Sequence, residues 1–214
     1  METMHYFITN LQIFSGNTNA VEKLKKYLKD IEVVFPTIED VFGQAWDDNQ
    51  INIELDDSKG GAIYDPTVNP HIVKMGIYNG NIQKEYPENL WGCLFHETHH
   101  AFMHPVIYHM GAKKDFNGGY EREPFNRAFM AMTYLRLNEK HVIGEQLYEH
   151  FLDKLEREMK NDGGKNLFKD YVSLFSKDTN NFSKFISYLK SSDTAFTVRS
   201  NFSQDLDKAN KFLM

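Results

Sequence analysis

The segment PENLWGCLFHETHHAFMH, residues 87–104, decides how this chain is interpreted. Pro87 suits the first turn of a helix and Pro105 follows the segment directly, so we expect one continuous helix that ends before Pro105. One turn of an α-helix takes about 3.6 residues. His96 and His100 therefore lie on one face of this helix with their imidazoles converging on one point.

The pattern His-Glu-x-x-His is typical of a catalytic zinc site. Two imidazoles from one helix face are zinc ligands, and Glu97, about 100° round the helix from His96, can take a proton from a zinc-bound water. The pattern therefore indicates one Zn²⁺ per chain and a metallohydrolase, and in particular a metallopeptidase with Glu97 as its general base.

A catalytic zinc site also needs a third protein ligand and an open fourth position for water. The segment GGYEREPFN, residues 118–126, offers the carboxylates of Glu121 and Glu123. It stands immediately before an amphipathic stretch that predicts a helix to about Asn138. Either carboxylate could complete the ligand set.

At this point the chain resembles the gluzincin metallopeptidases, in which the third ligand is a glutamate on the next helix, often within Glu-Gly-Phe-Ala. Glu-Pro-Phe-Asn at residues 123–126 is similar to that pattern, so the resemblance implies Glu123 as the ligand and leaves Glu121 as the alternative. The chain departs from the family where proline replaces the glycine and where Arg127 stands at a position that is aspartate in some members. We therefore expect Glu121 or Asn126 to hydrogen-bond a ligand imidazole. If Glu121 binds the metal, these roles swap.

The remaining histidines of the segment are expected to have other roles. The family pattern with a third histidine is excluded, because Val106 occupies that position. His104 adds one turn to the histidine face. The resulting pattern His-Glu-x-x-His-x-x-x-His is similar to that of proteases that cleave phage repressors, although their second motif is spaced differently. We expect His99 and His104 on the helix surface or beside the ligands rather than on the metal, and Cys93 as a small buried apolar residue.

The order of elements is similar to the gluzincin catalytic domain over residues 1–138. We predict an α+β fold: a zincin-like catalytic domain at residues 1–140, with a small mixed sheet, a zinc-site helix and a glutamate-bearing helix, and a helical subdomain at 141–214 packed on it. Asn17 to Asn19 offer N-caps for a first helix, which we expect Pro36 to break. Strands are predicted at 5–8, 11–14, 51–55, 62–64 and 71–78, and C-terminal helices at 147–155, 167–175, 182–189 and 204–212.

The resemblance also implies a place for substrate. In the family, the strand before the zinc helix is a sheet edge that pairs with an extended peptide; an interior, structural strand is the alternative here. Its residues are His71, Ile72, Val73, Lys74, Met75, Gly76, Ile77 and Tyr78. A tyrosine or histidine stabilises the oxyanion in related enzymes, and the candidates are Tyr134, Tyr148, Tyr171 and His109.

Composition limits the partners. The 214 residues carry a formal net charge of -6, which argues against a nucleic-acid partner. No run of 18 apolar residues is present, so no membrane partner is expected. The N-terminal residues lack the pattern of a signal peptide, and a single cysteine favours the cytoplasm over secretion with a removed signal peptide; the oligomeric state stays open.

Two other functional classes are alternatives to a peptidase. A zinc-binding scaffold or interaction protein would retain the fold without turnover, although a structural zinc site needs no general base. A domain without metal is the third class.

Overall fold

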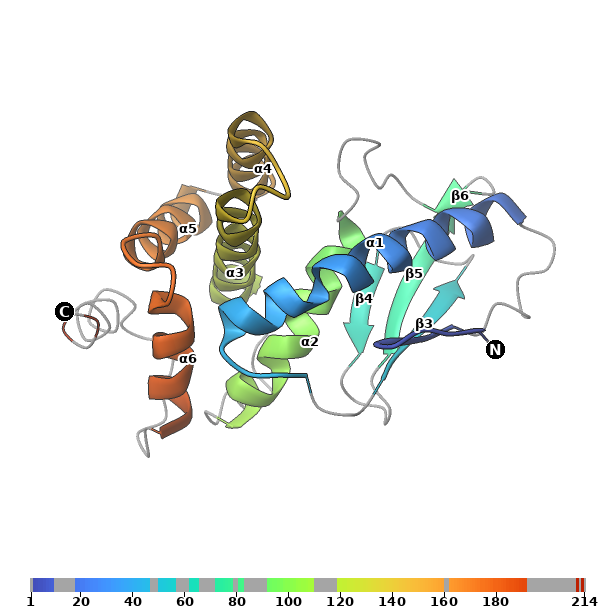
Figure 1. Ribbon diagram of the computed structural model, residues 1–214, viewed down its shortest axis with the longest axis horizontal. Helices are drawn as coiled ribbons and strands as arrows, with labels where there is room; N and C mark the ends of the chain where they lie inside the picture. Colours follow the sequence, from blue (N-terminus) through green and yellow to red (C-terminus); the bar gives the residue numbers. More distant parts are fainter. Residues whose placement is uncertain are drawn as a thin grey trace. The chain divides into compact units, whose positions relative to one another are not determined.

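Alternating apolar and polar residues build β3 (Ile51–Asp56), a central strand of the mixed sheet in the computed structural model (Figure 1). Ile51, Ile53 and Leu55 are buried on one face of the sheet, while Asn52 and Glu54 on the other face are half-buried. This alternation is the strand pattern that the sequence predicted, because successive side chains point to opposite faces.

The sheet combines parallel and antiparallel pairs. Its order is β1-β2-β3-β5-β4, with β6 paired to the end of β5. The central strands β2, β3 and β5 are parallel, whereas β1, β4 and β6 are each antiparallel to a neighbour. The other strands are β1 (Glu2–Thr3), β2 (Phe7–Thr9), β4 (Ala62–Asp65), β5 (Ile72–Tyr78) and β6 (Asn81–Ile82).

The structure describes most of the chain. The backbone is described at residues 2–9, 18–46, 50–56, 62–65, 72–78, 81–82, 92–109, 119–159, 162–191, 211 and 213. Side chains are described at these residues except 2, 18–20, 56, 76–78, 81–82, 104–109, 119–122 and 191. The strand predicted at 11–14 and nearly all of the helix predicted at 204–212 lie outside this part.

The first helix, α1 (Thr18–Phe42), buries an apolar face. Leu24, Leu28 and Ile31 are fully buried. The ring of Phe35 stacks on Tyr6 at 3.7 Å between centroids and meets Phe7 of β2 edge-on at 5.8 Å. α1 connects the parallel strands β2 and β3.

The prediction that Pro36 ends this helix is wrong, because α1 continues through it to Phe42. Proline removes one backbone hydrogen bond and bends a helix, but its φ is helical. Buried residues on both sides, including Phe35, Ile38 and Val41, offset that loss. Packing of an apolar face therefore outweighs the local signal.

The histidine-rich helix, α2 (Cys93–His109), also differs from its predicted limits. It begins after Gly92, whose carbonyl accepts the His96 amide at 3.0 Å. It does not end before Pro105 but extends to His109, so that second prediction of a proline stop is wrong. As in α1, a proline costs a hydrogen bond without forcing the helix to end.

The chain divides into two compact units, Met1–Pro36 with Trp46–Phe102, and Thr37–Ala45 with Met103–Met214. The first unit contains the sheet. The second contains α3 (Gly119–Glu139), α4 (Glu145–Arg157), α5 (Asp162–Phe175) and α6 (Asn181–Ser191). α3 packs against α4 and α5 within the second unit. The domain boundary expected at residue 140 stays a prediction.

Aromatic side chains hold the second unit together. Phe129 stacks on Phe182 at 4.7 Å between ring centroids, and Phe125 stacks on the same ring at 5.6 Å. Gly43, at the end of α1, has a φ of 78°, and a Cβ there would lie 2.5 Å from Ser183 Cβ. Glycine is therefore required at this turn for both reasons.

The α+β class and the small mixed sheet are confirmed by these elements.

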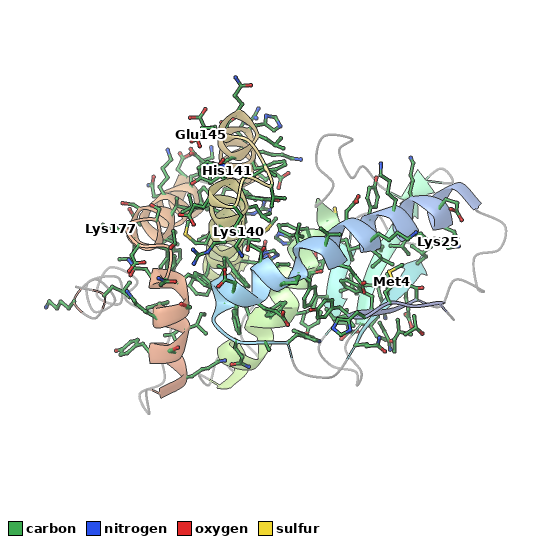
Figure 2. The ribbon with its side chains drawn as sticks, in the orientation of Figure 1. Met4, Lys25, Lys140, His141, Glu145 and Lys177 are labelled. Carbon is green, nitrogen blue, oxygen red and sulfur yellow. The ribbon has the colours of Figure 1, made fainter. Side chains whose placement is uncertain are left out.

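The α3–α4 turn carries exposed charged and polar side chains, among them Lys140, His141 and Glu145 (Figure 2). Of the two alternatives for the strand at residues 71–78, the edge strand is wrong and the interior strand fits, because β5 pairs with β3 on one side and with β4 on the other from Ile72 to Met75. Within the described part of the sheet β4 is an edge strand, and His71 lies outside that part.

Candidate metal centre

The two motif histidines converge on one point in the first unit. His96 and His100 lie one turn apart on α2, and their Nε2 atoms are 3.0 Å apart. Their rings meet almost at a right angle, with centroids 4.6 Å apart. Both residues therefore present the same ring nitrogen to the same region, as the four-residue spacing predicted.

This separation fits a tetrahedral zinc ion. Zinc–nitrogen bonds of 2.0–2.1 Å at a tetrahedral angle place two nitrogens about 3.3 Å apart. The observed 3.0 Å is within about 0.3 Å of that value. One of the two Nε2 atoms donates a hydrogen bond to the other, and both can bind a metal through their lone pairs when each ring carries its proton on Nδ1 instead.

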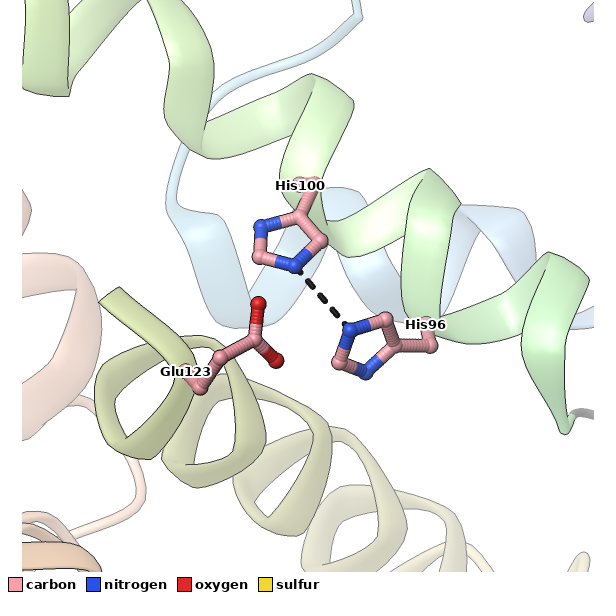
Figure 3. Close-up of side chains that lie close together, drawn as sticks. All are labelled: His96, His100 and Glu123. Atoms are coloured by element: carbon pink, nitrogen blue, oxygen red, sulfur yellow. Dashed lines mark hydrogen bonds between the residues drawn. The ribbon is translucent and has the colours of Figure 1, made fainter. Parts of the chain in front are cut away.

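Glu123 of α3 accompanies the two histidines. The ligand atoms of His96, His100 and Glu123 all lie within 4.8 Å of one another. Figure 3 shows the Glu123 carboxylate directed toward both rings, with a dashed line joining the two Nε2 atoms. Two imidazoles and one carboxylate are a donor set that zinc uses in catalytic sites, so these residues could hold such an ion.

Glu97 is held against the sheet. Its side chain is 8% exposed, and its Oε2 accepts a hydrogen bond from the Tyr64 backbone amide of β4 at 2.9 Å. Since Glu97 follows His96 on a rigid helix, this bond brings the predicted general base and the edge strand together. The sequence did not predict this contact.

His99 is part of the core rather than of the helix surface. It is fully buried, and its Nδ1–H donates to the Phe95 carbonyl at 2.7 Å. Burial lowers the pKa of His99 to about 3, although the bond to Phe95 opposes the shift. His99 is therefore a neutral core residue that hydrogen-bonds within its own helix, which distinguishes it from His96 and His100. Of the two expected places for His99, the helix surface is therefore wrong, and a position beside the ligands fits its burial and its electrostatic interaction with His96 and His100.

An aromatic cluster supports α2 just beyond His100. Phe102 is 2% exposed, and its ring lies 4.8 Å from Trp46 and 5.3 Å from Phe35. Leu94 and Phe95 bury further apolar surface on the same helix. Packing of this kind fixes the rotation of the helix and therefore the direction of its ligands.

The three tyrosines proposed to stabilise the oxyanion belong to the second unit. Tyr134 is 1% exposed and stacks on Phe151 at 4.5 Å, and Tyr171 is 2% exposed beside Phe125. Tyr148 is half-buried, and burial and the charges of Glu145 and Glu139 raise its pKa. Their catalytic role stays a prediction.

Several predicted residues stay untested. The side chains of Glu121, His104 and His109 lie outside the described part. Asn126 is completely buried on α3, and its hydrogen bond to a ligand imidazole stays a prediction. Cys93 is half-buried rather than fully enclosed. The choice of Glu123 over Glu121 therefore remains a prediction.

Sequence reasoning missed the Tyr64 amide and the Phe102 cluster. The alternation at residues 62–64 predicted a strand, but pairing on one side only is a property of the assembled sheet. No pattern within residues 62–64 predicts which backbone amide points to the open edge of the sheet. The apolar character of Phe102 and Trp46 was visible, but their contact joins segments 56 residues apart.

Comparison of the chain with protein-family models, curated proteins and solved structures gave no match. Among the described helices, none has the length and apolar character needed to span a membrane.

Proposed function

We propose that this protein is a zinc-dependent peptidase in which His96, His100 and Glu123 hold the metal and Glu97 is the general base. The observation that carries the proposal is the convergence of the two Nε2 atoms 3.0 Å apart beside a carboxylate held at the sheet edge. The resemblance of residues 96–100 and 123–126 to the gluzincin motifs supports it. Zinc in this site would act as a Lewis acid and lower the pKa of a water to about 7.

The chain's own residues then perform the proton transfers. Glu97 takes a proton from the attacking water as the water oxygen bonds to the peptide carbonyl carbon. The same carboxyl group returns the proton to the amide nitrogen as the C–N bond breaks. One water is consumed and one carboxyl and one amine terminus are formed, so a single carboxylate serves as base and then as acid.

A peptide substrate would pair with β4 rather than β5. β4 is an edge strand in the described part of the sheet, and it contacts Glu97 through Tyr64. An extended peptide adds to such an edge by main-chain hydrogen bonds. This assignment replaces the predicted binding to residues 71–78, because β5 has partners on both sides.

A zinc-binding protein without turnover is the second candidate. The hydrogen bond between Glu97 and the Tyr64 amide favours it, because a carboxylate that caps a sheet edge has a structural use without catalysis. Both candidates predict zinc. They differ in whether loss of the carboxylate affects hydrolysis or only the fold.

The test is a peptide-library digest by the zinc-loaded wild type and by Glu97→Gln. Glutamine keeps the size and an accepting oxygen, so zinc content and fold should be retained while the rate falls about 10²- to 10⁴-fold. Glu149→Gln, an exposed glutamate on α4, is the matched control and should cleave at the wild-type rate. Equal cleavage by Glu97→Gln would contradict the peptidase mechanism.

A further inference from the structure

The amide of Tyr64 faces the open side of β4. In an antiparallel pair, the N–H and C=O groups of alternate residues point to opposite sides of the strand. The Tyr64 amide donates to Glu97, so it points away from β5. The backbone N–H and C=O groups of Ile63 and Asp65 therefore point toward β5. The bond to Glu97 therefore uses a backbone group that the sheet itself does not need.

This bond restrains a carboxylate that would otherwise rotate. The terminal torsion of a glutamate is broad, so a helix alone does not fix the orientation of its two oxygens. Here Oε2 accepts the Tyr64 amide at 2.9 Å, and the side chain is 8% exposed. The donor belongs to a strand and the acceptor to a helix, so both partners are attached to rigid elements.

We propose that the backbone amide of Tyr64 is a positioning group for Glu97, holding Oε2 so that Oε1 receives the proton of the attacking water. This inference rests on the proposed peptidase function and adds to it a role for a strand amide. The Tyr64 side chain is not the functional part, because its ring is 3% exposed on the buried face of the sheet. Any residue with a backbone N–H that packs there would serve.

The test removes this N–H. Replacing Tyr64 by its α-hydroxy acid analogue puts an ester in place of the amide, retains the ring and every other N–H of β4, and weakens only the Ile63 carbonyl as an acceptor toward β5. We expect unchanged zinc content and KM, and a fall in kcat of about 100-fold, the cost of a misplaced catalytic group. The control is the same replacement at Asp162, the exposed first residue of α5, whose N–H the helix itself does not use, and it should leave kcat unchanged.

Amide hydrogen exchange provides a readout that does not depend on turnover. In metal-free protein, Glu97→Ala should accelerate exchange at Tyr64 about 10- to 100-fold, the range for a hydrogen bond to a charged acceptor. Glu97→Gln should keep it slow, because the glutamine oxygen also accepts.

The outcomes separate the two claims. Unchanged kcat with the ester at Tyr64, or an equal fall with the ester at Asp162, would overturn the positioning role. Unchanged exchange at Tyr64 in Glu97→Ala would overturn the hydrogen bond on which it rests. A zinc-loaded wild type that cleaves no peptide would instead refute the proposed function. The exchange experiment would still test the hydrogen bond between Glu97 and the Tyr64 amide, because it does not depend on turnover.

Discussion

Zinc should stabilise this protein through His100, and His100→Ala should remove that effect. His100 is 3% exposed, and its Nε2 lies 3.0 Å from that of His96. Moving to the separation of about 3.3 Å in a tetrahedral site needs a shift of only about 0.3 Å. Little of the binding free energy is therefore lost in rearranging the pair.

The size of the effect follows from linkage. A ligand that binds only the folded state at 100 times its Kd adds about 2.7 kcal/mol to the free energy of unfolding. For a chain of this size, each kcal/mol raises Tm by about 2–4 °C. Zinc should then raise Tm by about 5–10 °C.

The assay is thermal unfolding of metal-free protein with and without zinc. Each variant is compared with its own metal-free form, because removal of a buried imidazole also changes the starting stability. His150→Ala, an exposed histidine of α4, is the control and should keep the full shift. A shift of the same size in His100→Ala would refute the assignment of His100 as a ligand.

Two further predictions concern the third ligand and the packing behind α2. Glu123→Ala should release zinc, as measured by metal analysis after dialysis, whereas Glu121→Ala should lower its affinity by at most about 10- to 100-fold; the opposite result would make Glu121 the ligand. Phe102→Ala should cost about 3–5 kcal/mol in denaturant unfolding, because the ring is 2% exposed against Phe35 and Trp46, and a loss below about 1 kcal/mol would show that the cluster does not support the helix.

Local spacing predicted the elements that carry the centre. The four-residue interval between His96 and His100 requires convergence on any regular helix, and the two-residue alternation of Ile51, Ile53 and Leu55 requires a strand with one buried face. These features depend on covalent geometry and periodicity. They could therefore be predicted without knowledge of the rest of the chain.

Other features depend on distant contacts and were predicted wrongly or missed. Pro36 and Pro105 remain inside helices, because proline has a helical φ and removes only one backbone hydrogen bond. At Pro36 the buried apolar side chains of α1 offset that loss. The pairing of β5 on both sides depends on β3 and β4, which no pattern within residues 71–78 reveals. The hydrogen bond between Glu97 and Tyr64 follows from that same sheet order, so it was also invisible.

Anomalous diffraction from a zinc-loaded crystal, measured on both sides of the zinc absorption edge, tests the proposed centre most directly. The account predicts one peak per chain, about 2.0–2.2 Å from Nε2 of His96, Nε2 of His100 and a carboxylate oxygen of Glu123, with the fourth position free of protein ligands. No peak beside these atoms, or a fourth protein ligand that closes the site, would contradict it.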